Sequence, residues 1–188
     1  YLPHIISMVV VCAMIKEFTE SCGFINVIAT QFGYDGRSML NVSELFVPIY
    51  VISNVWQGIG WGSIVYLAAL TGIDMQLYEA ARIDGAGRWK QTLHVTIPGI
   101  LPTIVTMFIM RCGQIMSVGH EKILLLMNET TQETADVIST FVYRMVFVNT
   151  NPQYSYSAAV GLFNSVANFV LVIIANTVSR KLSDTSLW

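Results

Sequence analysis

The residues of this chain that could bind a ligand are polar side chains inside long apolar segments. Arg111 and Gln114 lie three residues apart in one such segment, and Asn164 and Asn168 lie four apart in another. Each spacing places its two side chains on one face of a helix. Because polar groups are costly in apolar surroundings, these residues are candidates for lining a ligand pathway.

Trp56 and Gln57 form a third candidate pair, in an apolar segment that also contains several glycines. The indole ring could stack on a ligand, and the amide could hydrogen-bond to it. All six residues also have structural interpretations. The arginine could extend to the end of its segment, the amides could bond between helices, and the tryptophan could anchor at an interface. These alternatives remain open from the residues alone.

Catalytic and cofactor-binding motifs are missing from the sequence. There is no Gly-x-x-x-x-Gly-Lys-Ser/Thr, no Gly-x-Ser-x-Gly and no His-Glu-x-x-His. The three cysteines and three histidines are scattered, and a net charge of -2 gives no basic excess for nucleic acid. We therefore predict no enzyme activity, cofactor, metal site or nucleic-acid partner. ATP binding would require a separate polypeptide.

The composition favours a membrane protein. Of the 188 residues, 54% are hydrophobic and 12% are charged, against about 25% charged in a typical soluble domain. A membrane span needs about 20 mostly apolar residues, and lipid requires such spans to be helical. We predict an all-α, polytopic transmembrane bundle forming one domain, 1–188. The approximate spans are 1–19, 45–71, 97–118 and 157–179, and Pro48 and the glycines near 60 are expected to kink or interrupt the second one.

The charges of the connecting segments predict the orientation of these spans. Segments 74–94 and 180–188 hold five Lys or Arg residues in 30, whereas 16–44 and 121–156 hold four in 65, together with eight acids. Basic residues accumulate on the cytoplasmic side of a membrane. We therefore expect segment 74–94 and the C-terminus to be cytoplasmic.

Segment 74–94 has the features of a short amphipathic helix. Asp74 can cap its first turn, and Gly85 can end it. Ala81 lies four residues before Gly85, which gives a patch with little side chain, and Glu79 is spaced to pair with Arg82. Such a helix could lie on the membrane, dock into a groove of a cytoplasmic partner or simply connect two spans.

The same segment carries a long spaced pattern. Glu79-Ala80-Ala81 is followed after three residues by Gly85, and after nine more by Val95-Thr96-Ile97-Pro98. This pattern resembles the EAA loop of binding-protein-dependent ABC transporter permeases, which ends in Ile-x-Leu-Pro. Val95 and Ile97 depart from it but keep apolar bulk. The sequence around the motif, and the stretch after Tyr154, resemble the branch that imports oligo- or polysaccharides.

This resemblance implies a type I ABC importer permease fold in the bacterial inner membrane. In such proteins the loop is a coupling helix that docks on the ATP-hydrolysing subunit. The implied contact residues are Glu79, Ala80, Ala81 and Gly85, flanked by Arg82 and Asp84. The implied partners are a cytoplasmic ATP-binding subunit, a second homologous permease subunit, an extracytoplasmic solute-binding protein, the lipid bilayer and a carbohydrate substrate.

Two further expectations concern the ends and the outer loop. The chain opens at Tyr1 directly into an apolar run, so we expect an N-terminally truncated permease. A helix-like stretch from Ala135 to Phe147 could meet the binding protein on the outer side.

Alternative functions remain open at this point. A permease for amino acids or peptides would share the loop pattern. A non-ABC transporter or a membrane scaffold would not need it. Arg111 is the one Asp, Glu, Lys or Arg residue well inside a predicted span, and no acid lies there, which disfavours ion-coupled transport.

Overall fold

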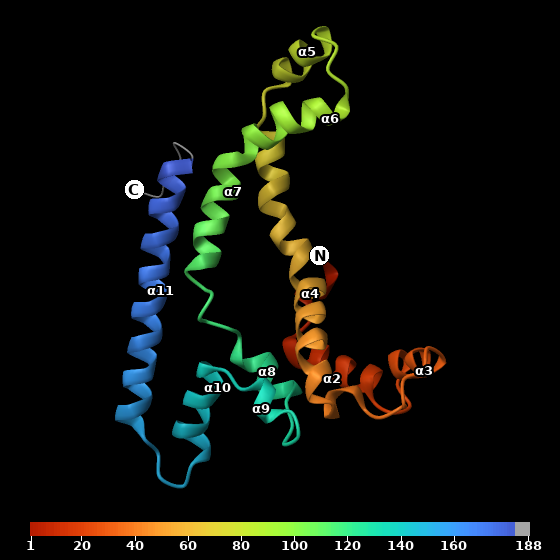
Figure 1. Ribbon diagram of the computed structural model, residues 1–188, viewed down its shortest axis with the longest axis vertical. Coiled ribbons are helices and arrows are strands. Elements are labelled where there is room, and N and C mark those ends of the chain that lie inside the picture. Colours follow the sequence, from red (N-terminus) through yellow and green to blue (C-terminus); the bar gives the residue numbers. More distant parts are fainter. Residues whose placement is uncertain (183–188) are drawn as a thin grey trace. The chain divides into compact units, whose positions relative to one another are not determined.

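The computed structural model of the chain describes residues 1–182, with side chains through residue 180, and this part is built of helices without strands. Figure 1 shows their succession. The α-helices are α1 (Leu2–Ile5), α2 (Met8–Thr19), α3 (Phe24–Gln31), α4 (Ser43–Thr71), α5 (Met75–Ile83), α6 (Arg88–Gln91), α7 (Ile97–Cys112), α8 (His120–Leu126), α9 (Gln132–Ala135), α10 (Ile138–Tyr143) and α11 (Tyr154–Leu182). Three shorter turns are the 3₁₀-helix η1 (Met39–Asn41) and the π-helices η2 (Thr92–Thr96) and η3 (Arg144–Val148).

Two helices among the described residues are long and apolar enough to cross a membrane. One runs through α6, η2 and α7 as Arg88–Cys112, and the other is Tyr154–Arg180. A third span results if α4 and α5, which are bent by 67° at their junction, are taken together. The predicted spans 45–71, 97–118 and 157–179 each fall largely on one of these helices. The tail 183–188, which entered the prediction of a cytoplasmic C-terminus, lies outside the described residues.

The predicted first span, 1–19, is not one continuous helix. Ile6 and Ser7 have extended ψ angles of 136° and 140°, which separate the four residues of α1 from the twelve of α2. An extended residue cannot continue the i to i−4 hydrogen-bond ladder, so each piece is shorter than a straight span requires.

Prolines shape the long helices in two ways. Pro48 lies inside α4, and α4 continues through the glycine-containing stretch near residue 60. Of the predicted kink or interruption, the interruption is therefore wrong, and the kink stays a prediction. Pro98 has no N–H to donate and would clash with the carbonyl of residue 94 in a regular helix. The π-helix η2 covers Thr92–Thr96 directly before it, which widens the turns where that carbonyl lies.

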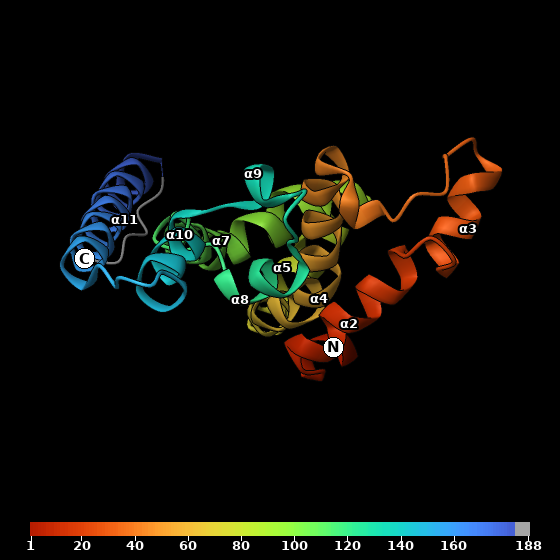
Figure 2. The same ribbon diagram turned by 90° about the horizontal axis from the view of Figure 1, so that it is seen from below.

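The described chain divides into two compact units. The first contains Tyr1–Gly60 and Ser117–Asn164, and the second contains Trp61–Met116 and the residues from Ser165 onward. A buried apolar cluster lies in the first unit, where α2, α4 and α8 meet, whereas α3 extends away from α4 (Figures 1 and 2). The members of this cluster are Cys12, Leu40, Phe46, Ile123, Leu126 and Ala135.

A hydrogen-bonded turn closes this cluster at the end of α8. The Asn128 carbonyl oxygen Oδ1 accepts from the backbone N–H of Thr131 at 3.0 Å and from its hydroxyl at 2.9 Å. The Asn128 amine donates to the carbonyl of Leu40 at 3.0 Å and to Oδ1 of Asn41 at 2.6 Å. One amide therefore fixes the α8–α9 turn to η1, although 87 residues separate Asn41 from Asn128.

Asn128→Ala should destabilise the first unit. The buried Thr131 would lose the Oδ1 acceptor and keep only its longer contacts to the Asn128 backbone, and the bonds from the Asn128 amine to η1 would be lost. A buried polar group without a partner costs about 1–3 kcal/mol. The measurement is the thermal unfolding temperature of the full-length permease in its assembled complex, with Thr30→Val as control, since the Thr30 hydroxyl bonds only to Val27 of its own helix. Equal unfolding temperatures for the two variants would contradict this account.

Candidate functional site

The helix α5, which contains the Glu-Ala-Ala sequence, is closed at both ends by local hydrogen bonds. At its start the Asp74 carboxylate accepts from the backbone N–H of Gln76 at 2.9 Å. At its end the N–H of Ala86 bonds to the carbonyl of Ala81 at 2.9 Å, and the N–H of Gly85 bonds to that of Arg82 at 3.0 Å. This pair of bonds is a Schellman motif, whose left-handed residue here is Gly85 with φ +74°.

One side-chain hydrogen bond attaches α5 to the helix Arg88–Cys112, and a second attaches the turn after α5 to the same helix. The Tyr78 hydroxyl lies 2.9 Å from the hydroxyl of Thr96, and the Gln91 amine donates to the carbonyl of Ala86 at 2.8 Å. Figure 1 shows α5 and α6 together beyond the adjoining ends of α4 and α7. These two bonds connect α5 and the turn after it to a long apolar helix.

The two faces of α5 differ in exposure. Tyr78 and Ala81 are half-buried, so Ala81 belongs partly to the inner face. The other proposed contact and flanking residues, Glu79, Ala80, Arg82, Asp84 and Gly85, are exposed. No ion pair joins Glu79 to Arg82 in this part of the structure, although their spacing predicted one.

Ile83 on α5 was missed by the sequence reasoning. Its side chain is 87% exposed, and it lies one helical turn after Glu79. Met75 and Leu77 of the same short helix are exposed as well, so α5 presents several apolar side chains, as surfaces that contact another molecule do. The available signal for Ile83 was its position inside the EAA pattern, between Arg82 and Asp84.

The candidate pathway residues of the second unit lie near the end of α7 and on α11. Arg111 and Gln114 are exposed, and the Gln114 N–H bonds to the Arg111 carbonyl at 3.1 Å. The side-chain oxygen Oδ1 of Asn168 accepts from the backbone N–H of Met116 at 3.2 Å. Asn168 therefore has a structural role in fixing the chain after α7.

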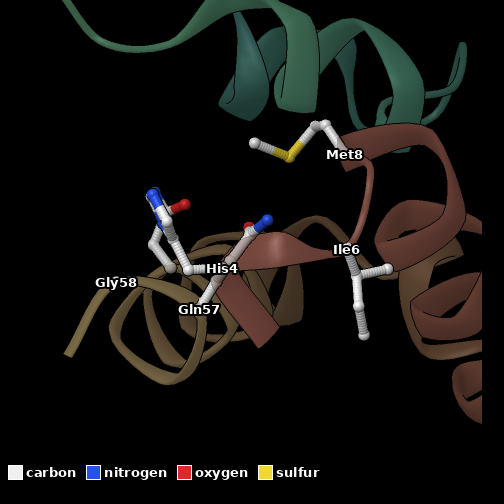
Figure 3. A pocket seen from close by; sticks show the side chains of 6 residues that line it. His4, Ile6, Met8, Gln57 and Gly58 are labelled. Carbon is white, nitrogen blue, oxygen red and sulfur yellow. The ribbon is translucent and has the colours of Figure 1, made fainter. Parts of the chain in front are cut away.

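The first unit contains three of the candidate pathway residues. Gln57 and Asn164 line two different pockets, and Trp56 lines neither of them. Gln57 is buried and lines a pocket of about 310 Å³ together with His4, Ile6, Met8, Asn54 and Gly58. Figure 3 shows the side chains of Gln57 and Met8 bordering the same open space. Asn164 lines another pocket, of about 300 Å³, with His120 and Tyr143, and Trp56 is half-exposed outside both.

Behind the first of these pockets lies a buried lysine that the sequence reasoning counted only as a loop charge. Lys122 on α8 is 2% exposed, and its ammonium donates to Oδ1 of the pocket residue Asn54 at 3.1 Å. Neither residue stood out in the sequence, because 68 positions separate them.

The arrangement of α5 and the long helices is shared with known proteins. Residues 1–184 match the family described as binding-protein-dependent transport system inner membrane component. The polygalacturonan/rhamnogalacturonan transport system permease protein YteP of Bacillus subtilis (strain 168) is 38% identical over 189 residues, which cover all of this chain and 58% of YteP.

Solved structures agree with this match. A chain in the crystal structure of a bacterial ABC transporter that imports the acidic polysaccharide alginate has 43% identity and a TM-score of 0.91, over 97% of this chain and 64% of its own. A chain in the bacterial alginate ABC transporter complexed with alginate pentasaccharide-bound periplasmic protein also has 43% identity, with a TM-score of 0.92, over 100% and 65%.

The chain thus spans about three-fifths of the length of the relatives it matches. The all-α membrane-permease fold expected from the sequence and the resemblance carried by the EAA pattern are both confirmed. The chain belongs to the family of binding-protein-dependent transport system inner membrane components.

Proposed function

We propose that this chain forms the membrane-spanning permease part of an ATP-driven carbohydrate importer, and that α5 receives the movement of a separate ATPase subunit. The observation that carries this proposal is the construction of α5. It is capped at both ends, exposes Glu79, Ala80 and Ile83, and is bonded to a long apolar helix through Tyr78 and Thr96.

A saccharide substrate is supported by the similar proteins. YteP is named for polygalacturonan and rhamnogalacturonan, and the similar solved transporters import alginate. Identities of 38% and 43% over nearly the whole chain favour the same broad substrate class here over amino acids or peptides.

The proposed setting is the bacterial inner membrane, crossed several times, with segment 74–94 and the C-terminus on the cytoplasmic side. The proposed partners are the ATP-binding subunit, a second homologous permease subunit and an extracytoplasmic solute-binding protein. A permease–binding-protein contact is supported by the similar transporter crystallised with a saccharide-bound periplasmic protein. The positive charges of Arg82, Arg88 and Lys90 support the cytoplasmic side for α5.

Glu79→Lys should abolish most of the stimulation of ATP hydrolysis by saccharide. Glu79 is exposed, so reversing its charge should leave the permease folded while disturbing a charged contact with the ATPase. Disrupting a charge pair within an interface costs about 2–5 kcal/mol, so we expect saccharide-stimulated ATPase activity to fall at least tenfold. The assay uses the full-length permease, its partner permease, the ATPase and the binding protein in proteoliposomes.

Glu133→Lys, an exposed charge reversal outside segment 74–94, is the control. Full stimulation in Glu79→Lys would refute the docking role of α5.

Gly85→Val should also weaken assembly, for a conformational reason. A valine at φ +74° is strained, and the position opens onto empty space, so no clash within the chain contributes. Left-handed backbone costs a residue with a β-carbon about 1–2 kcal/mol, roughly a factor of ten in the population of the native turn. Gly85→Asn, which tolerates this conformation, is the matched variant.

The measurement for both Gly85 variants is the amount of ATPase that co-purifies with the permease. We expect a large loss for valine and retention for asparagine. Normal recovery of ATPase with the valine variant would show that the turn after α5 does not control docking.

A further inference from the structure

The first unit contains a buried positive charge that the fold does not explain. Lys122 is 2% exposed, and within the described residues no carboxylate lies at salt-bridge distance from its ammonium. Its neighbours include the Asn54 amide, at 3.1 Å, the ring of Tyr50, whose centroid is 5.8 Å away, and the buried thiol of Cys12, which interacts with it electrostatically. Buried lysines are rare, and they are usually paired with a carboxylate.

This placement lowers the stability of the protein. Burial lowers the pKa of Lys122 below its usual value near 10.5. The unfolded chain then binds a proton more tightly than the folded one, so the buried ammonium disfavours folding at neutral pH, and the loss is relieved as the pH rises toward 10.5. An apolar side chain of similar length would fill the site without this loss, and packing therefore does not account for the charge.

The hydrogen bond from Lys122 orients the amide of Asn54. An ammonium can only donate, so it holds the oxygen Oδ1 toward α8 and turns the Nδ2 amine away from Lys122. Asn54 itself is exposed and lines the pocket that contains His4 and Gln57. The pocket is therefore lined in part by the oriented amide of Asn54, which is hydrogen-bonded to the buried ammonium of Lys122.

The pocket has a matching electrostatic character. None of its lining residues, His4, Ile6, Met8, Asn54, Gln57 and Gly58, is acidic. A positive charge acts more strongly through protein than through water, because the surroundings screen it less. A ligand carboxylate near Asn54 would therefore gain more from Lys122 than a hydroxyl group would.

We propose that Lys122, acting through Asn54, makes this pocket select saccharides that carry a carboxylate group over neutral ones. In this proposal Lys122 orients the amide of Asn54 and supplies the positive charge, and Asn54 contacts the ligand. The inference rests on the proposed function as a carbohydrate permease and adds to it the charge class of the substrate.

The test compares uptake of trigalacturonate with uptake of its carboxyl-reduced, neutral counterpart. Full-length permease variants are assembled with the partner permease and ATPase in proteoliposomes and supplied with the same solute-binding protein. Because that protein is identical in every assay, a change in the acidic-to-neutral ratio between variants reports on the permease.

We expect the wild type to prefer the acidic trisaccharide. Lys122→Met should lower its uptake about tenfold, which corresponds to about 1.4 kcal/mol, and leave the neutral sugar within about twofold. Lys122→Arg should keep much of the preference. Lys16→Met, which removes an exposed charge from α2, should change neither rate.

Asn54→Asp separates selection from folding. This change places a carboxylate beside the Lys122 ammonium, so it should raise the thermal unfolding temperature while abolishing the acidic preference. A carboxylate at position 54 also repels an acidic ligand directly, so loss of the preference shows that Asn54 meets the ligand, and Lys122→Met is the variant that tests the lysine.

The outcomes distinguish the two proposals. If the wild type takes up neither trisaccharide, the carbohydrate function fails, and the inference fails with it. If the wild type takes up both and the ratio is unchanged in Lys122→Met and Asn54→Asp, the inference alone fails. An equal loss of both activities in Lys122→Met would likewise overturn it, since that would mark a packing defect.

Discussion

A backbone N–H or C=O group surrounded by apolar side chains or lipid has no water to bond with, and the architecture of this chain follows from that constraint. The segments 43–71, 88–112 and 154–180 satisfy these groups internally as helices. At two breaks in the ladder, the local structure compensates. The widened turn η2 precedes Pro98, and the turn after α5 closes its carbonyls through the N–H groups of Gly85 and Ala86.

The same constraint explains why polar side chains gather at the ends of helices. Asp74 caps α5, Asn128 closes the turn after α8, and Asn168 receives the N–H of Met116 after α7. Asn168 illustrates how one amide in an apolar segment can be structural although its type also suits a ligand. The structure shows Asn168 on α11 bonded to the N–H of Met116. The sequence alone could not decide between this structural role and ligand binding.

Two features of the described chain are not required by the fold, and both lie where a permease would need specificity. Ile83 is exposed on α5, and Lys122 is buried with no carboxylate at salt-bridge distance among the described residues. Such departures from a self-sufficient fold are expected at functional positions, and we have proposed an ATPase contact for the first and recognition of acidic saccharides for the second.

The sequence by itself determined the helical class, three of the long apolar helices, the family and the start and end of α5. These follow from local information: hydropathy over about 20 residues, a capping Asp74, a left-handed Gly85 and the fixed spacing to Pro98. It did not reveal the break in segment 1–19, because hydropathy does not register the extended conformation of Ile6 and Ser7. Only the tertiary structure placed Lys122 against Asn54, 68 residues away, beside the pocket that Gln57 lines. Such a contact depends on how α4 and α8 pack, and no local pattern encodes it.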